Sequence, residues 1–181
     1  MSKTTHLQVL DTRRSAVDPA DRRSVRIARL ERADYDAVVA MLGRCSAATL
    51  QRRFHGITTG VPYVNRLLGP ATNGIGYGAW LDSRCVGVAS LHFASESSAD
   101  MAVLIEDEWQ QRGVGWALAA EVIGQARKRG LGSLRADILA ENYFIPSALA
   151  RFGPIRASIS FGVYTIWLDL QQPDPDVEGV A

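Results

Sequence analysis

A glycine-rich turn joins an apolar strand to an amphipathic helix in the second half of the chain. Gly113-Val114-Gly115 follows the apolar run 101–105 and opens a helical pattern over residues 114–129. The first N–H groups of a helix have no internal acceptor and lie at the positive end of the helix dipole, so phosphates bind well there. Glycine also lets a phosphate group approach the backbone closely. The turn therefore predicts an anion-binding loop.

Three interpretations of this turn compete. A dinucleotide-binding fingerprint requires a third small residue, where this chain has Leu118, and an acid about 20 residues further on, where it has Leu134 and Arg135. A nucleotide P-loop ends in Gly-Lys-Ser/Thr, whereas this turn reads Gly-Trp-Ala. A tight turn without any ligand is the remaining alternative for an isolated Gly-x-Gly.

The rest of the chain alternates between the periodicities of strands and helices. The predicted strands are 25–30, 76–81, 84–93, 101–105, 134–138, 155–159 and 164–170. The predicted helices are 33–45, 46–54, 61–68, 114–129 and 143–152. Asp82-Ser83 separates two of the strands and predicts a hairpin. This mixture favours an α/β or α+β fold, in which helices cover one sheet.

The length of 181 residues, with 47% of them hydrophobic, suits one domain with a full core. Residues 1–24 are polar and rich in arginine and aspartate, and residues 171–181 are rich in proline and acidic or amide side chains. Neither segment can bury enough apolar surface to order itself. We expect a flexible arm over 1–24, a folded domain over 25–170 and a flexible tail over 171–181.

Charge and metal-ligand patterns exclude several functions. Lysine and arginine number 20 against 19 aspartates and glutamates, so no global field favours nucleic acid or a membrane surface. Cys45, Cys85 and the three histidines show no metal-ligand spacing, and no bound metal is expected. No signal peptide or apolar run of about 18 residues is recognisable, which predicts a soluble cytoplasmic protein.

Several ordered features resemble the acyl-CoA-binding core of the GNAT superfamily of N-acetyltransferases. The strand residues Val103-Leu104-Ile105 are followed by Gln110-x-x-Gly113-x-Gly115 and an amphipathic helix. Downstream, Asn142 precedes Gly153 by eleven residues, as the family's asparagine precedes its glycine. The resemblance extends over about residues 25–170, and it is closest in pattern to the bacterial protein-lysine acetyltransferase branch.

The resemblance implies a twisted, mixed but mostly antiparallel sheet with helices on both faces. It also implies that the sheet splays between its fourth and fifth strands, which contain Met101 and Leu134, and admits the pantetheine arm of acetyl-CoA there. The diphosphate would rest on the glycine-rich loop. The cofactor-binding residues implied in this way are Val103, Leu104, Ile105, Gln110, Gln111, Arg112, Gly113, Val114, Gly115 and Asn142.

Acetyl transfer to an amine requires the nitrogen to be neutral, and a lysine amine with a pKa of about 10.4 is less than about one part in a thousand neutral at pH 7. The related branch often carries a glutamate at the start of the strand before the loop, and the matching position here is Asp100. We take Asp100 as the candidate base, with Glu96 as a neighbour; a polar strand start is the alternative. Glu106, Asp107 and Glu108 are expected to be solvated loop charges.

The resemblance also concerns two further catalytic groups, the oxyanion donor and the general acid. A backbone N–H near Leu104 and Ile105 would stabilise the oxyanion. The family's usual acid, a tyrosine, is absent, because its position is Leu149. Tyr143 or Tyr164 would have to replace it, or the CoA thiol leaves as an anion.

The acceptor is suggested by one more segment. The run from Ser46 through Arg53-Phe54 to Gly56 resembles the Ser-x-x-Ser/Thr-x-x-x-Arg-Phe-Phe segment of the protein-acetylating branch, in the region that lines the acceptor cleft. Protein lysine is therefore the leading acceptor and a small-molecule amine the second. A non-catalytic acyl-CoA-binding module is a third alternative. Direct transfer is favoured, since neither cysteine has a nearby catalytic histidine in the sequence, and a homodimer stays open.

Overall fold

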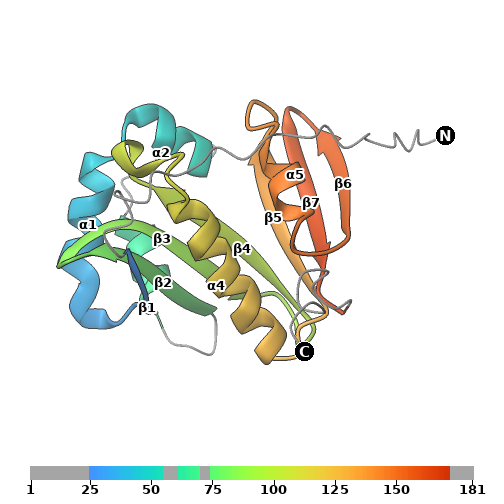
Figure 1. Cartoon of the computed structure of the whole chain (residues 1–181), viewed down its shortest axis with the longest axis horizontal. Coiled ribbons are helices and arrows are strands. Elements are labelled where there is room, and N and C mark those ends of the chain that lie inside the picture. The colour runs from blue at the N-terminus through green and yellow to red at the C-terminus, as the bar shows by residue number, and fades with distance from the viewer. Residues whose placement is uncertain (1–24, 55–60, 70–73, 172–181) are drawn as a thin grey trace, which may run out of the picture.

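The computed structural model describes residues 25–54, 61–69 and 74–171, and these form one seven-stranded sheet with helices on both faces (Figure 1). The strands are β1 (Arg26–Arg29), β2 (Gly74–Leu81), β3 (Arg84–Phe93), β4 (Ser98–Ile105), β5 (Ser133–Leu139), β6 (Ile155–Ser160) and β7 (Val163–Asp169). The α-helices are α1 (Tyr35–Arg44), α2 (Ala47–Phe54), α3 (Val61–Leu67), α4 (Val114–Lys128) and α5 (Ile145–Leu149), with 3₁₀ turns η2 (Arg32–Asp34) and η3 (Asp107–Trp109).

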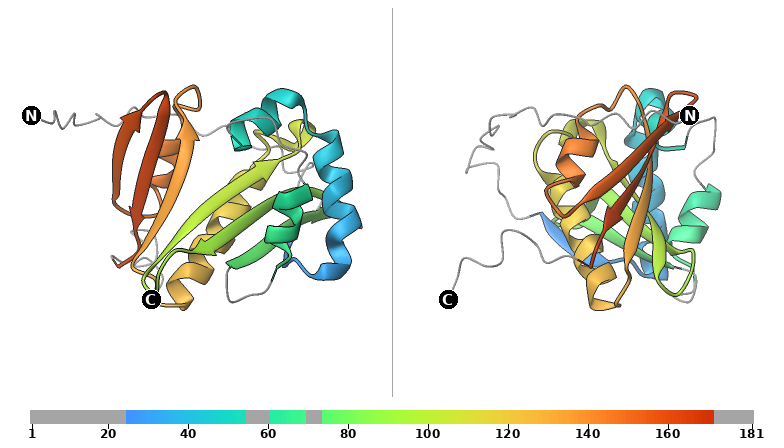
Figure 2. Two further views of the ribbon diagram at one scale, coloured as in Figure 1. Left: turned by 180° about the vertical axis from the view of Figure 1, so that it is seen from behind. Right: turned by 90° about the vertical axis from the view of Figure 1, so that its right-hand side faces the viewer.

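The strands are ordered β1-β2-β3-β4-β5-β7-β6, and β4–β5 is the parallel pair among antiparallel neighbours. This pair is short. Its register runs from Ser98 opposite Ser133 to Asp100 opposite Arg135 and then ends, while β4 pairs with β3 as far as Ile105. Figure 2 shows β5, β7 and β6 leaning away from the rest of the sheet beyond that point. The expected mixed sheet, splayed between its fourth and fifth strands, is confirmed.

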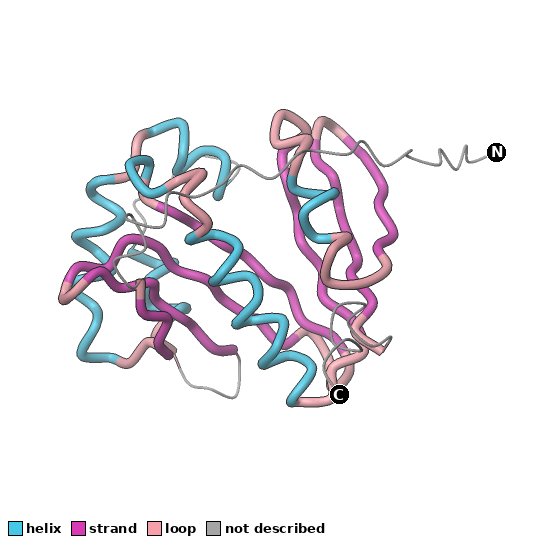
Figure 3. Tube along the Cα trace, viewed as in Figure 1, coloured by secondary structure: helices cyan, strands magenta, loops and turns pink. Residues whose placement is uncertain are grey.

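Two hydrophobic cores lie on opposite faces of the sheet. The first joins α4 and α5 to the sheet through residues such as Leu118, Val122 and Leu149. The second joins α1 and α3 to the opposite face through Val38 and Val64. Figure 3 shows α4 crossing one face of the β2–β4 region. Alternation along β4 divides its side chains between these cores, because neighbouring side chains of a strand point to opposite faces.

The ends of α4 follow the signals in the sequence. Gly113 at its N-cap has a φ of 81°, a left-handed conformation that side chains disfavour. At the other end Gly130 has a φ of 73°, and the Leu131 N–H donates to the Ala126 carbonyl at 3.1 Å. This hydrogen bond satisfies a carbonyl group that the end of the helix would otherwise leave without a partner.

Element bounds differ from the prediction at a few places. β4 begins at Ser98, three residues earlier than the predicted 101–105, so Asp100 lies within the strand and does not mark its start. α5 is shorter than the predicted 143–152, because turns precede and follow it. The predicted arm 1–24 lies outside the described residues, as does the predicted tail except Gln171. None of the described helices is long and apolar enough to cross a membrane.

The sequence predicts that the acidic residues after β4 are solvated loop charges, and for Glu106 this prediction is wrong. Glu106 is only 3% exposed, and its carboxylate accepts hydrogen bonds from Arg44 on α1, at 3.0 Å, and from Arg84 on β3. Its backbone N–H donates to the Val86 carbonyl at 3.0 Å. Glu106 therefore holds the C-terminal end of β4 against α1 and β3. Glu108 is exposed and lies 3.3 Å from Arg84, so the prediction of a solvated charge is correct for this residue.

Glu106→Gln should destabilise the protein, because it removes the buried charge that pairs with two guanidinium groups. Breaking a buried pair costs roughly 3 kcal/mol or more. The matched change Glu108→Gln should stay within about 0.5 kcal/mol of wild type, since exposed pairs contribute little. Urea unfolding followed by circular dichroism measures both, and equal midpoints for the two variants would contradict the structural role of Glu106.

Candidate active site

The loop 110–115 combines two unusual backbone conformations with the start of α4. Gln111 has a φ of 59° and Gly113 a φ of 81°. The first hydrogen bond inside α4 is donated by the Ala117 N–H to the Gly113 carbonyl at 3.0 Å. The N–H groups that precede Ala117 in the helix therefore have no acceptor within it and lie at its positive end. The arrangement suits a diphosphate.

Gly115 leaves open space in front of this backbone. A Cβ placed on it would have its nearest contact at 3.6 Å, with Cγ1 of Ile105, which is an ordinary van der Waals distance. Packing within the protein therefore does not require glycine at this position. A ligand that approaches the backbone does require it, because a side chain would stand between the N–H groups and the phosphate oxygens.

Gln110 and Asp107 connect the loop to the start of α2. The Gln110 amide donates to Thr49 Oγ1 and to the Ile105 carbonyl, both at 3.1 Å. Asp107 accepts hydrogen bonds from the Ser46 N–H at 2.8 Å, the Ser46 hydroxyl at 2.7 Å and the Thr49 hydroxyl at 2.8 Å. The loop and α2 are thus held together by side chains about 60 residues apart in the sequence, and the Gln110 amide is engaged inside this network.

Asp107 was not identified as a site residue from the sequence. Its partial burial acts to raise the pKa of the carboxyl, but the hydrogen bonds from Ser46 and Thr49 outweigh it and hold the pKa below its usual range. Ser46 caps the N-terminus of α2, since its Oγ accepts a hydrogen bond from the Thr49 N–H at 3.2 Å. A serine at the start of a helical pattern is a local signal for a cap. No pattern in the sequence shows that the carboxylate of Asp107 binds this serine.

The next group of predicted residues lies along the splay. From Met101 onward, the edge of β4 that faces β5 has no strand partner in the described registers. Val103 and Ile105 are half-buried on the α4 side, whereas Leu104 is 3% exposed and packs in the core beneath α1. Arg112 is exposed, and its guanidinium carbon lies 5.3 Å from the Trp109 ring centroid. The predicted residues of β4 thus lie along its unpaired edge, and the loop 110–115 follows at the end of that strand.

Asn142 lies across the splay, in the turn after β5. Its N–H donates to the Leu139 carbonyl at 2.9 Å, and its carbonyl accepts from the Ile145 N–H at 3.0 Å. The side chain is half-buried. Gly153, at the matching family distance, has a φ of 155°, and a Cβ there would lie 2.8 Å from the Asp169 carbonyl oxygen. Close backbone packing therefore explains this glycine.

Asp100 lines a cleft of about 470 Å³ between the sheet and helices α2 and α3. Its side chain is 52% exposed, and Oδ1 lies 3.9 Å from Nη1 of Arg135 on β5. Arg135 in turn donates to Asp137 at 2.7 Å. The remaining walls of the cleft include Arg53 of α2 and Arg66 of α3. Asp100 is therefore at the last paired position before β4 and β5 separate, and it is open to a bound molecule.

The tyrosines and cysteines differ in their access to this region. Leu149 is 6% exposed and belongs to the α4-side core, while Tyr143 is 78% exposed in the turn before α5 and Tyr164 is half-buried on β7. Burial raises the pKa of the Cys45 thiol to about 12 and that of the Cys85 thiol to about 11. At pH 7 at most roughly one part in 10⁴ of either is thiolate, which is the nucleophilic form.

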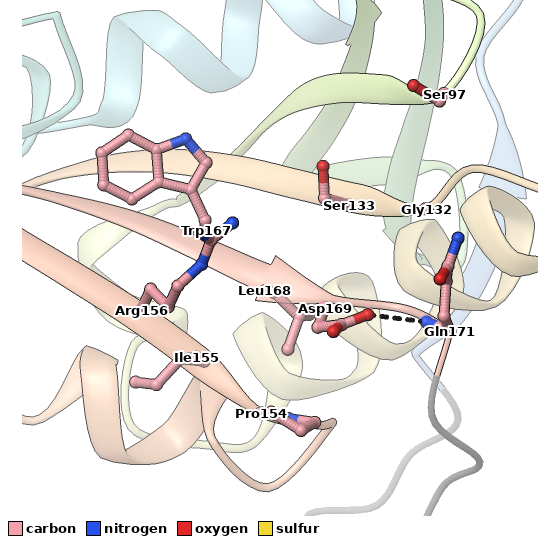
Figure 4. Close-up of a pocket in the computed structure, with 10 residues that line it drawn as sticks. All are labelled: Ser97, Gly132, Ser133, Pro154, Ile155, Arg156, Trp167, Leu168, Asp169 and Gln171. Carbon is pink, nitrogen blue, oxygen red and sulfur yellow. Dashed lines mark hydrogen bonds between the residues drawn. The ribbon is translucent and has the colours of Figure 1, made fainter.

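A second hollow of about 450 Å³ lies further along β5 and β7 (Figure 4). Ser133, Trp167 and Asp169 line it, and the Gln171 N–H donates to Asp169 at 2.9 Å. Arg135 and Trp167 are directly opposite in the β5–β7 register, so they share one face of the sheet. The described residues contain no group of three or more potential metal ligands.

Comparisons with known proteins agree with this geometry. Residues 49–144 match the Acetyltransferase (GNAT) family. The GNAT domain of PAT from S. lividans is similar in structure, with 22% identity, a TM-score of 0.71 and coverage of 80% of this chain and 90% of that chain. The ribosomal-protein-S18-alanine N-acetyltransferase from Escherichia coli has 16% identity, a TM-score of 0.60 and coverage of 84% and 97%. The curated proteins contain no significant match.

A third similar structure is the paia N-acetyltransferase from Thermoplasma acidophilum in complex with coenzyme A, with 15% identity, a TM-score of 0.59 and coverage of 81% of this chain and 99% of that chain. The family match extends over more than half of the chain, and the chain belongs to the GNAT family of acetyltransferases. It is an N-acetyltransferase with acetyl-CoA as its cosubstrate.

Gly115→Asp should weaken the binding of CoA by at least about tenfold, which corresponds to about 1.4 kcal/mol. The new carboxylate would occupy the space before the loop and repel the diphosphate. Gly124→Asp makes the same change on the same helix, where a Cβ meets nothing within 4 Å, and should bind CoA like wild type. Calorimetric titration measures both, and wild-type affinity in folded Gly115→Asp would place the diphosphate elsewhere.

Proposed function

We propose that the chain transfers the acetyl group of acetyl-CoA directly to the amine of a protein lysine, with Asp100 as the general base. We further propose that residues 25–170 are the catalytic domain. The observation that carries the proposal is the position of Asp100, at the point where β4 and β5 separate and at the bottom of an open cleft.

The cosubstrate would lie along the free edge of β4. Its diphosphate would contact the backbone of Gln111, Arg112, Gly113, Val114 and Gly115, while Gln110 holds the loop in shape through Thr49. Residues 101–105 span about 17 Å at the usual rise of a strand. An arm that starts at the loop and follows Val103, Leu104 and Ile105 therefore ends near Asp100, with Asn142 on the opposite side.

The chemistry that acetyl-CoA supplies is an acyl carbon activated by a sulfur leaving group. The neutral lysine nitrogen forms the new bond to that carbon, the carbon–sulfur bond breaks, and CoA leaves as a thiolate, while the nitrogen loses its second proton to solvent as the amide forms. Asp100, directly or through one water, takes the proton that the ammonium must lose first. A backbone N–H of β4 near Leu104 would bind the carbonyl oxygen as negative charge develops.

No tyrosine replaces the absent acid in this scheme. Leu149 is buried in the α4-side core and carries no proton to give. A CoA thiol with a pKa of about 8.5 leaves acceptably as an anion, so an acid is not required. The high pKa values of Cys45 and Cys85 support direct transfer, because neither thiol is available as an acyl carrier.

Lysine of a protein is favoured as the acceptor by the segment from Ser46 to Phe54. It resembles the corresponding segment of the bacterial protein-lysine acetyltransferase branch, and α2, which it forms, supplies Arg53 and Phe54 to the cleft above Asp100. A cleft that opens directly to the surface beside the base accepts a long side chain from a partner protein.

Asp100→Asn should lower kcat at pH 7 by about 10²- to 10⁴-fold, the usual contribution of a positioned base, with little change in acetyl-CoA affinity. The deficit should narrow toward pH 9 or 10, because the amine then loses its proton without help. Steady-state rates with a confirmed acceptor, measured across pH, test both effects.

The control for this variant is Asp82→Asn. Asp82 lies in the β2–β3 turn with a φ of 52°, a conformation that asparagine adopts readily, so the same loss of charge is made far from the cleft. Its kcat should equal that of wild type. Full kcat/KM in Asp100→Asn at pH 7 would remove Asp100 as the base.

Initial-rate plots for acetyl-CoA and the acceptor should intersect, as a ternary complex requires. Cys45→Ala and Cys85→Ala should retain wild-type kcat once corrected for the folded fraction. Parallel plots, together with an acetyl adduct on either cysteine by mass spectrometry, would show a covalent intermediate and contradict direct transfer.

A further inference from the structure

The cleft at Asp100 has opposite charges on its two sides. Its floor is formed by the sheet and carries Asp100 and Asp137 against Arg135, which leaves one net negative charge. Its wall is formed by α2 and α3 and carries Arg53 and Arg66. Within the described residues neither of these two arginines has a carboxylate at ion-pair distance. The wall therefore has two positive charges that no carboxylate of the described residues neutralises.

Aromatic contacts hold Arg53, and its side chain donates no hydrogen bond to another described residue. Its guanidinium carbon lies 4.8 Å from the Tyr63 ring centroid and 5.2 Å from the Phe54 ring centroid, and these two rings contact each other edge to face at 5.0 Å. Both distances are within the range of a cation–π interaction, which attracts the guanidinium to the rings without using its N–H groups as hydrogen-bond donors to an oxygen. The group is thus preorganised for a carboxylate.

Two buried polar atoms of the same wall have no partner among the described residues. They are Nε of Arg53 and the hydroxyl of Tyr63, and Tyr63 is itself 8% exposed. Leaving a buried donor without an acceptor costs free energy, so such atoms are rare in folded proteins unless a ligand completes them. Both atoms belong to residues that line the cleft beside Asp100, so an anionic group bound against this wall is a candidate partner for them.

The second hollow lies next to the cleft on the same face of the sheet. Arg135 borders the first, Trp167 lines the second, and the two residues are opposite each other in the register. Arg156 lies beside Trp167 on the edge strand β6, is exposed and has no carboxylate partner among the described residues. A single amino acid would fill one hollow, whereas an extended peptide can lie across both.

From these observations we infer that the acceptor is an acidic segment of a protein, in which the acetylated lysine has carboxylates on both sides. The ammonium binds the negative floor at Asp100. One flanking carboxylate accepts hydrogen bonds from Arg53 and Tyr63 and pairs with Arg66, and the other pairs with Arg156. This inference rests on the proposed lysine acetylation and names the sequence context that the enzyme selects.

The test uses short peptides that hold one lysine between glutamates or between glutamines, with both binding and acetyl transfer measured. Hydrogen bonds to a charged group predict a preference for the glutamate peptide of roughly 10- to 100-fold in kcat/KM. The preference should shrink in about 1 M salt, which screens charges beyond about 3 Å. Peptide binding, measured by fluorescence anisotropy in the presence of CoA, should follow the same order.

Arg66→Gln, Arg156→Gln and Tyr63→Phe should each lower kcat/KM more for the glutamate peptide than for the glutamine peptide, so that the ratio of the two values falls. A purely structural role would lower kcat/KM for both peptides by the same factor. The ratio of the two kcat/KM values therefore reports recognition of the anion. Lys128→Gln, at the exposed end of α4, removes the same charge away from the cleft and should change neither value.

The outcomes separate this inference from the proposed function. Equal transfer to both peptides overturns the acidic context and leaves lysine acetylation standing. Binding that prefers glutamate and depends on Arg66, without any transfer, supports the anion site and contradicts lysine as the acceptor. Absence of both binding and transfer overturns the acidic context and the proposed lysine acetylation together. Efficient acetylation of free glutamate or lysine, in place of the peptides, overturns the inference in favour of a small-molecule acceptor.

Discussion

The short pairing of β4 with β5 is the constraint on which the rest of the structure depends. Three residue pairs, ending at Asp100 opposite Arg135, join the two halves of the sheet, and beyond them each strand stays paired only to its outer neighbour. Unpaired strand edges are costly when buried, because their N–H and C=O groups need partners. A cosubstrate arm with amide groups supplies such partners. The same feature that weakens the sheet therefore creates the site.

The two halves also contact each other outside this pairing. On one face Trp116 of α4 stacks on Phe152 with ring centroids 4.1 Å apart, and on the other face Arg52 of α2 pairs with Glu141 at 3.0 Å. Asp107 ties the start of α2 to the phosphate loop. Hydrogen bonds thus connect the loop 110–115 and the turn before it with α2, one of the helices that line the cleft.

In the proposed scheme, the charge pattern of the cleft selects the acceptor. Acetyl transfer alone needs a base and an oxyanion donor, and neither explains why the Arg53 guanidinium lies over the Tyr63 ring or why its Nε and the Tyr63 hydroxyl are buried without partners among the described residues. Binding energy placed beside the reacting amine orients it, and correct orientation is worth more to the rate than affinity alone. In this scheme α2 and α3 select the acceptor, and the sheet performs the reaction.

The sequence by itself determined the features that depend on neighbouring residues. The alternation of strands and helices, the glycines at both ends of α4 and the Ser46 cap are local, because periodicity and backbone conformation are set within a few positions. The loop 110–115 was found for the same reason. Only the tertiary structure decided which charges meet: Glu106 is buried between Arg44 and Arg84, and Asp107 reaches Ser46 across 61 residues. Partners so distant in the chain leave no local pattern, since burial and pairing arise only when the sheet and helices pack.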